Sequence, residues 1–125
     1  MELPFKHILI CDDSPDFFLN DLQSLGFKIE YKPAISNEDL GKLANDYDAI
    51  LIKSALILNE AFFSQFTNIK LVLRPGSGLD NVDLAYCKAK GIAVINSPNG
   101  NSNAVGEHVL GMLLMLANNL YKAIT

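Results

Sequence analysis

The spacing of apolar residues along the chain predicts short strands that alternate with helices. Four apolar runs and one weaker run, the second, are typical of strands, and in chain order they cover residues 7–11, 28–31, 49–52, 71–73 and 92–95. Parallel strands need crossover connections, and both faces of a parallel sheet must be covered. The pattern therefore predicts an α/β fold, with a doubly wound parallel sheet of five strands in a flavodoxin-like order.

Capping residues between these strands mark where helices begin and end. Pro15 is typical of a first helical position, and Gly26, which follows an apolar face at helical spacing, is typical of a helix end. Further helix starts are predicted where a side-chain oxygen can accept from a free backbone amide, namely at Ser36 or Asn37, at Asn59 and at Asp83. The last of these helices is predicted to end at Gly91.

The chain changes character after the fifth predicted strand. Residues 96–101 are a run of turn formers around Pro98, which is typical of a domain edge. We therefore expect one domain over residues 1–98, followed over residues 99–125 by a hinge and a long helix at 103–121. The apolar stripe of that helix spreads sideways and needs cover on more than one side, so we expect a homodimer built on this helix.

Composition restricts the classes of protein that fit the sequence. Of the 125 residues, 50% are apolar and 19% are charged, which is typical of one compact globular domain. The net charge of −4 argues against a nucleic-acid surface, and the longest apolar stretch, at 109–117, is too short to span a bilayer. Cys11 and Cys87 lie far apart with no metal-binding pattern around them, so we expect reduced core thiols in a cytoplasmic protein and no metal site.

Ligands of open α/β sheets bind beyond the carboxyl ends of the strands, so candidate binding residues are sought there. Lys53 and Ser54 follow the third strand and offer a cation and a hydroxyl to an anionic ligand, unless the lysine is an ordinary surface residue. The turn Gly76-Ser77-Gly78 follows the fourth strand, and its glycines let backbone amides approach a carboxylate or phosphate. Taken alone, this Gly-x-Gly is more typical of a plain tight turn. It is not a dinucleotide fingerprint, because the third glycine of G-x-G-x-x-G is absent.

An acidic pair, Asp12-Asp13, follows the first strand and leaves a second function open. Such a pair holds Mg²⁺ in response-regulator receiver domains, although a helix cap is the more ordinary role for Asp13. A receiver also needs a phosphorylatable aspartate at the end of the third strand, where this chain has Lys53-Ser54. A stand-alone module that binds small anions is the other alternative.

Residues 49–107, taken together, resemble the D-isomer-specific 2-hydroxyacid dehydrogenase family. The matching segments, in order, are Lys53-Ser54-Ala55, Arg74-Pro75-Gly76-Ser77-Gly78-Leu79-Asp80-Asn81-Val82-Asp83 and Asn96-Ser97-Pro98-Asn99-Gly100-Asn101-Ser102, followed by Glu107. The Asn-Gly-Asn-Ser segment is most similar to the phosphoglycerate dehydrogenase branch. Residues 1–48 fit the family's substrate domain but carry no distinctive motif.

The resemblance implies that this chain is the substrate-binding part of such an enzyme. It implies that backbone amides of Gly76, Ser77 and Gly78 bind the substrate carboxylate, and that Ser77 also approaches the nicotinamide cofactor. It further implies substrate contacts from Lys53, Ser54 and Asn101. The implied reaction of the complete enzyme is hydride transfer between NAD and C2 of a 2-hydroxy acid. The candidate reaction converts 3-phosphoglycerate to 3-phosphohydroxypyruvate in serine biosynthesis.

The sequence departs from the family's pattern at two residues, and it covers only the first part of that pattern. Lys53 stands where phosphoglycerate dehydrogenases usually have arginine, and lysine offers a point charge without the bidentate fork. Gly106 replaces the usual alanine before Glu107. The family's catalytic arginine, glutamate and histidine, and its glycine-rich NAD loop, belong to a following domain. We therefore expect no catalytic residue in this chain, no activity from it alone, and NAD bound mainly by the absent downstream domain.

Overall fold

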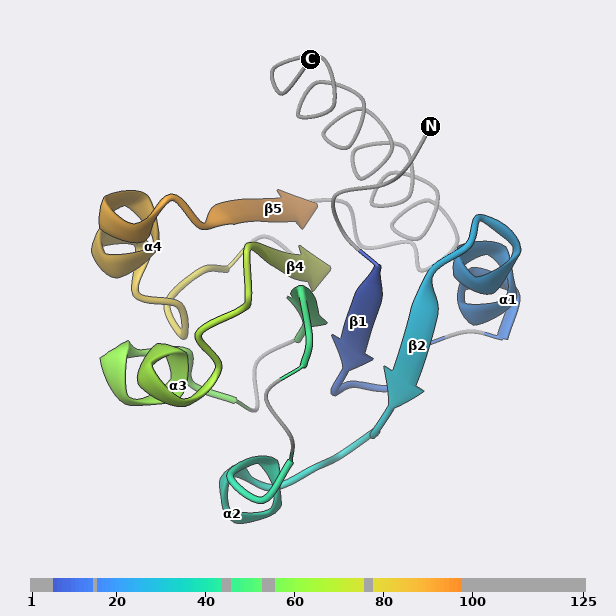
Figure 1. The fold of residues 1–125 in the computed structure, drawn as a ribbon, viewed down its shortest axis with the longest axis horizontal. Helices are drawn as coiled ribbons and strands as arrows, with labels where there is room; N and C mark the ends of the chain where they lie inside the picture. The colour runs from blue at the N-terminus through green and yellow to red at the C-terminus, as the bar shows by residue number, and fades with distance from the viewer. Residues whose placement is uncertain (1–5, 15, 44–45, 53–55, 76–77, 98–125) are drawn as a thin grey trace.

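The structure is a computed structural model, and it describes residues 6–14, 16–43, 46–52, 56–75 and 78–97. Strands and helices alternate along this part of the chain as β1 His7–Ile10, α1 Asp16–Ser24, β2 Lys28–Tyr31, α2 Asn37–Leu40, β3 Ala49–Leu51, α3 Glu60–Gln65, β4 Leu71–Pro75, α4 Leu84–Lys90 and β5 Ala93–Ser97. The strands form one parallel sheet in the order β2-β1-β3-β4-β5 (Figure 1). This is the flavodoxin-like order that the sequence predicts. The helix predicted at 103–121 lies outside the described residues.

Helices cover both faces of the sheet, with α1 on one face and α2, α3 and α4 on the other (Figure 1). The strands are apolar at consecutive positions because alternate side chains enter opposite faces. Ile8 and Ile10 of β1 pack on the side of α1, whereas Leu9 packs with Ile50 and Val72 on the side of the other three helices. All five of these side chains are fully buried. The two apolar layers fix the register of the strands, and with it the position of the strand ends.

Three helices, α2, α3 and α4, begin after predicted capping residues, whereas Pro15, predicted to start the first helix, lies outside the described residues. The side chains of Ser36, Asn59 and Asp83 each accept a hydrogen bond from the backbone amide three residues later. α4 ends at Gly91, whose φ of 73° is left-handed. The spacing of Leu40 and Leu43 predicts a second helix that carries both residues, but α2 ends at Leu40. In the part of the chain that the structure describes, no helix is long and apolar enough to cross a membrane.

The two cysteines are buried in the layer beneath α2, α3 and α4, and neither forms a disulfide. Burial, with a smaller contribution from the neighbouring Asp12 carboxylate, raises the pKa of the Cys11 thiol to about 12. Burial also raises the pKa of Cys87. Both thiols are therefore protonated at neutral pH and act as small core residues, as predicted, rather than as nucleophiles.

Candidate functional site

The carboxyl ends of β1, β3 and β4 lie side by side at one edge of the sheet (Figure 1). Parallel pairing continues just beyond β1 and β3. The backbone amide of Cys11 donates to the carbonyl of Leu51, and that of Ile52 donates to the carbonyl of Leu73, both at 3.0 Å. The chain segments that leave these three strands therefore start from neighbouring points. This is the edge at which parallel sheets bind ligands.

One of the six residues predicted to bind substrate, Gly78, belongs to the described part of the chain. It is exposed and follows β4 at the ligand-binding edge. The predicted partners that lie outside the described residues are Lys53, Ser54, Gly76, Ser77 and Asn101. Their roles stay predictions.

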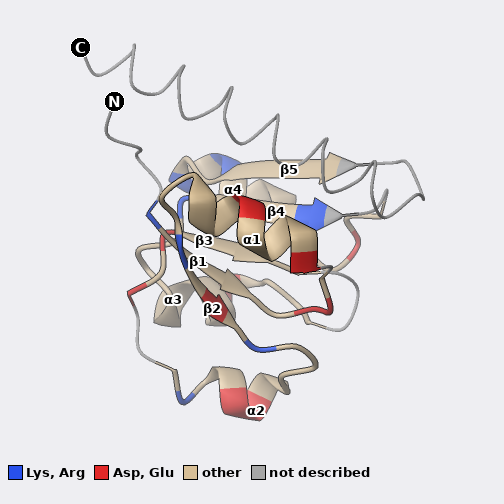
Figure 2. Cartoon of the chain, turned by 90° about the vertical axis from the view of Figure 1, so that its right-hand side faces the viewer, with Lys and Arg blue, Asp and Glu red and all other residues tan. Residues whose placement is uncertain are grey.

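Arg74 is a cation at this edge that the sequence analysis did not assign to the site. It is the fourth residue of β4, and its side chain is half-buried. A Cβ atom built on Gly78 would lie 3.7 Å from Nη2 of Arg74, so the guanidinium packs against the turn on which an anion is expected. Figure 2 shows where the basic and acidic residues of the described chain lie along its strands and helices. The signal in the sequence was an arginine at the end of the apolar run Leu-Val-Leu.

The loops after β3 and β4 are joined to each other by a backbone bridge. Leu58 and Val82 pair in parallel outside the named strands, and both are buried. The amide of Leu58 donates to the carbonyl of Asn81 at 2.8 Å, and the amide of Asp83 donates to the carbonyl of Leu58 at 2.9 Å. The bridge thus fixes the register of Leu58, after β3, against Val82, after β4.

The acidic pair after β1 is tied to the end of β2. The hydroxyl of Tyr31 donates to Oδ1 of Asp13 at 3.0 Å and accepts from the backbone amide of Ser14 at 3.2 Å. The Ser14 hydroxyl donates to the carbonyl of Asp12 at 3.2 Å. Among the described residues, no group of three or more His, Cys, Asp or Glu side chains could hold a metal ion. These contacts give Asp13 a structural role, and they lend no support to a receiver-type magnesium site.

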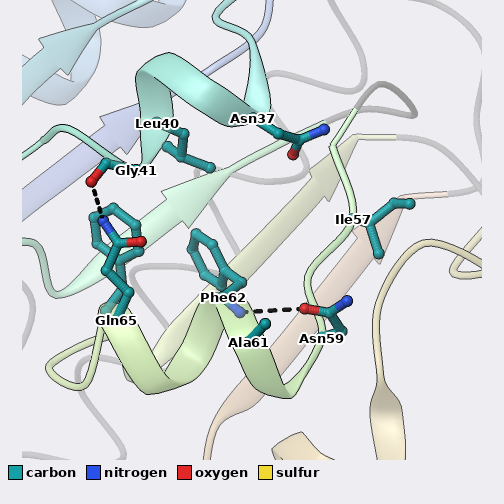
Figure 3. Close-up of a pocket in the computed structure, with 9 residues that line it drawn as sticks. Asn37, Leu40, Gly41, Ile57, Asn59, Ala61, Phe62 and Gln65 are labelled. Carbon is teal, nitrogen blue, oxygen red and sulfur yellow. Dashed lines mark hydrogen bonds between the residues drawn. The ribbon is translucent and has the colours of Figure 1, made fainter.

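A hollow of about 350 Å³ lies between α2 and α3 (Figure 3). Two of its polar side chains already have backbone partners, since Oδ1 of Asn59 accepts from the amide of Phe62 at 3.2 Å, and Nε2 of Gln65 donates to the carbonyl of Gly41 at 2.7 Å. None of the described residues that line it is charged. The hollow therefore lacks a group that could neutralise an anionic ligand, unlike the edge beside Arg74.

The fold and the residues at the carboxyl ends of the strands define the class of protein. It is a flavodoxin-like α/β domain that has a glycine-containing turn and a cation where its strands end. The family model for the D-isomer specific 2-hydroxyacid dehydrogenase, catalytic domain, matches residues 8–124. The chain belongs to this family. Because this match covers nearly the whole chain, the family assignment takes the place of the alternative that the chain is a response-regulator receiver domain.

Relatives of the chain include D-3-phosphoglycerate dehydrogenases. The chain is 31% identical over 112 residues to the enzyme of Synechocystis and 33% identical over 118 residues to that of Sus scrofa. These matches cover 90% and 94% of the chain but 20% and 22% of the relatives, so the chain spans about a fifth of their length. The structure of NAD+-bound 3-phosphoglycerate dehydrogenase from Entamoeba histolytica superposes with a TM-score of 0.64 at 21% identity, covering 75% of the chain and 33% of that structure. This likeness shows the shared fold.

Proposed function

We propose that the chain is the substrate-binding part of an NAD-dependent D-2-hydroxyacid dehydrogenase that acts on 3-phosphoglycerate in serine biosynthesis. The observation that carries the proposal is the likeness, over 90% and 94% of the chain, to D-3-phosphoglycerate dehydrogenases. The proposed reaction oxidises the C2 hydroxyl to a keto group and gives 3-phosphohydroxypyruvate. A hydride passes from C2 to NAD, and the hydroxyl proton passes to a base.

The proposed substrate site lies at the edge formed by the ends of β3 and β4. Backbone amides of residues 76–78 bind the carboxylate, and further substrate contacts come from Lys53, Ser54 and Asn101. The guanidinium of Arg74 supports this assignment, because it packs against Gly78 and adds positive charge beside the turn. The substrate carries a carboxylate and a phosphate, so the two cations Lys53 and Arg74 match its two anionic groups.

The described residues do not provide the pyrophosphate cradle by which a dinucleotide cofactor is held. Asn81 stands where the fingerprint requires a third glycine, and both its carbonyl and its side chain bond to the loop after β3. We therefore propose that NAD is bound mainly by a separate domain, with Ser77 of this chain reaching the nicotinamide. On this proposal the chain binds and orients the substrate and supplies no catalytic residue, so it is inactive alone.

The proposed domain organisation follows the turn run around Pro98. Residues 1–98 form the substrate-binding domain, and residues 99–125 form a hinge and the first helix that leads into the NAD-binding domain. A homodimer is proposed through the helix at 103–121, because its apolar stripe needs cover on more than one side. These last residues lie outside the described part of the chain.

Titration of 3-phosphoglycerate into ¹⁵N-labelled protein tests the proposed site. The amide signals of Gly76, Ser77 and Gly78 should move before any others, and inorganic phosphate at the same concentration should move them less because it lacks the carboxylate. A Lys53→Met variant should bind more weakly, whereas Lys70→Met, an exposed lysine at the opposite end of β4, should bind like the parent. Shifts confined to other parts of the chain would contradict the proposal.

A further inference from the structure

The side chain of Asn81 makes a contact between the two site loops that the backbone bridge does not provide. Its Nδ2 atom donates to the carbonyl of Leu56 at 2.8 Å. Its own carbonyl accepts from the amide of Leu58, also at 2.8 Å. Asn81 therefore holds the loop after β3 at two points, and the side-chain contact is the one nearer to β3.

Both ends of this clamp, the Asn81–Leu56 contact, are close in sequence to residues that are proposed to bind substrate. Leu56 is two residues after Ser54, so their Cα atoms are at most about 7 Å apart. Asn81 is three residues after Gly78, so those Cα atoms are at most about 11 Å apart. A change in the clamp is therefore passed over a short stretch of backbone to both proposed anion-binding segments.

The clamp lies where a lost hydrogen bond is not easily replaced by water. Leu56 is 2% exposed and belongs to the core layer beneath α2, α3 and α4. A carbonyl left without a donor in such surroundings is unfavourable, so the loop would have to move to regain a partner. Asparagine suits the position because it donates from a short side chain. An aspartate of the same size would place a negative oxygen against the carbonyl.

We propose that Asn81 is a positioning residue of the substrate site. It ties the chain after β3, at Leu56, to the chain after β4, and the substrate contacts of the proposed function fall within these two segments. This inference rests on the proposed function, because the substrate contacts of those residues are part of it. Asn81 acts by ordering the site before the ligand arrives, which leaves less conformational freedom to be lost on binding.

Two substitutions remove the amide donor: Asn81→Ala, and Asn81→Asp, which keeps the size of the side chain. In the 125-residue protein, 3-phosphoglycerate should bind about tenfold more weakly to either variant than to the parent. The ligand should still move the amide signals of residues 76–78, but the shifts at Lys53 and Ser54 should shrink, because the loop after β3 is then held only by the backbone bridge at Leu58, which is farther along the chain from Ser54. A general loss of stability would not produce this unequal response. The difference in affinity for 3-phosphoglycerate between Asn81→Asp and the parent should become smaller toward pH 4, where the introduced carboxyl regains a proton to donate.

Asn59→Ala is the matched control, since it removes one side-chain hydrogen bond to a backbone amide, within the first turn of α3. It should lower the free energy of unfolding and leave the affinity unchanged. Parent-like affinity of both Asn81 variants, with undiminished shifts at Lys53 and Ser54, would overturn the positioning role. An equal loss of affinity in Asn59→Ala would also overturn it. Failure of the unsubstituted protein to bind 3-phosphoglycerate through residues 76–78 would instead count against the proposed function, and it is seen without any substitution.

Discussion

Replacement of Gly78 by alanine should weaken ligand binding while the fold stays intact. The positive-φ glycines of the described chain are Gly26 and Gly91, so alanine at residue 78 meets no left-handed backbone. The nearest described atom to the added Cβ is Nη2 of Arg74 at 3.7 Å, which is an ordinary van der Waals contact. The substitution therefore introduces neither backbone strain nor a steric clash in the described part of the structure.

The expected magnitudes differ for stability and for binding. The free energy of unfolding should rise, by less than about 1 kcal/mol, because alanine restricts the unfolded chain more than glycine does. A carboxylate oxygen has to come within about 3 Å of a backbone nitrogen, and the new methyl group stands on the turn that must make this approach. Loss of one hydrogen bond to a charged group is worth about 1.5 to 3 kcal/mol, which corresponds to a Kd raised roughly ten- to a hundredfold.

Two measurements separate these effects: the Kd of 3-phosphoglycerate from ¹⁵N spectra, and the free energy of unfolding from urea titrations. Gly91→Ala is the control, because Gly91 has a left-handed φ of 73° and precedes β5 at the edge of the sheet opposite the proposed site. That variant should lose about 1 to 2 kcal/mol of stability and keep its affinity. Parent-like affinity in Gly78→Ala would refute the assignment of this turn to the substrate carboxylate.

The 125-residue chain alone should form no NADH from 3-phosphoglycerate and NAD, because its sequence has neither a dinucleotide loop nor an acid/base pair; NADH formation in proportion to the protein concentration would show the opposite. The parent should sediment as a dimer and a Met112→Lys, Leu116→Lys variant as a monomer or an insoluble protein, because lysines would interrupt the proposed apolar interface. A parent that stays monomeric at high concentration excludes that interface. Burial raises the pKa of the Cys11 thiol from 9.0 to about 12, so the folded state holds this proton more tightly than the unfolded state does. The resulting contribution to the free energy of unfolding is fully present below pH 9 and is lost as the pH rises toward 12. The free energy of unfolding should fall across this window, and less so in Cys11→Ala; equal slopes would contradict the burial argument.

The fold was largely predictable because its determinants are local. Apolar runs that enter both faces of the sheet identified all five strands, and single capping residues such as Asn59 and Asp83 marked helix starts. The apolar spacing predicts a second helix that reaches Leu43, whereas α2 ends at Leu40, because the same spacing is also satisfied by the turn at residues 41–42. Where periodicity is compatible with two backbone shapes, tertiary packing decides between them.

The contacts within the candidate site were less predictable, because they depend on side-chain packing and on which strands are neighbours in the sheet. The sequence indicated the turn that contains Gly78, because glycines directly after a strand are typical of a turn. The approach of Arg74 to that turn depends on how its side chain folds over the strand end. The bond from Asn81 to Leu56 spans 25 residues and exists because β3 and β4 are neighbours in the sheet. No periodicity along the chain carries that information.

The role of this chain in a dehydrogenase is tested most directly by the activity of the protein that its complete reading frame encodes. That protein should form NADH from NAD and 3-phosphoglycerate, and the Lys53→Met substitution should raise the KM for 3-phosphoglycerate more than it lowers kcat. Lys70→Met should leave both constants unchanged. A folded product that forms no NADH from 3-phosphoglycerate or from any other D-2-hydroxy acid would contradict the proposed function.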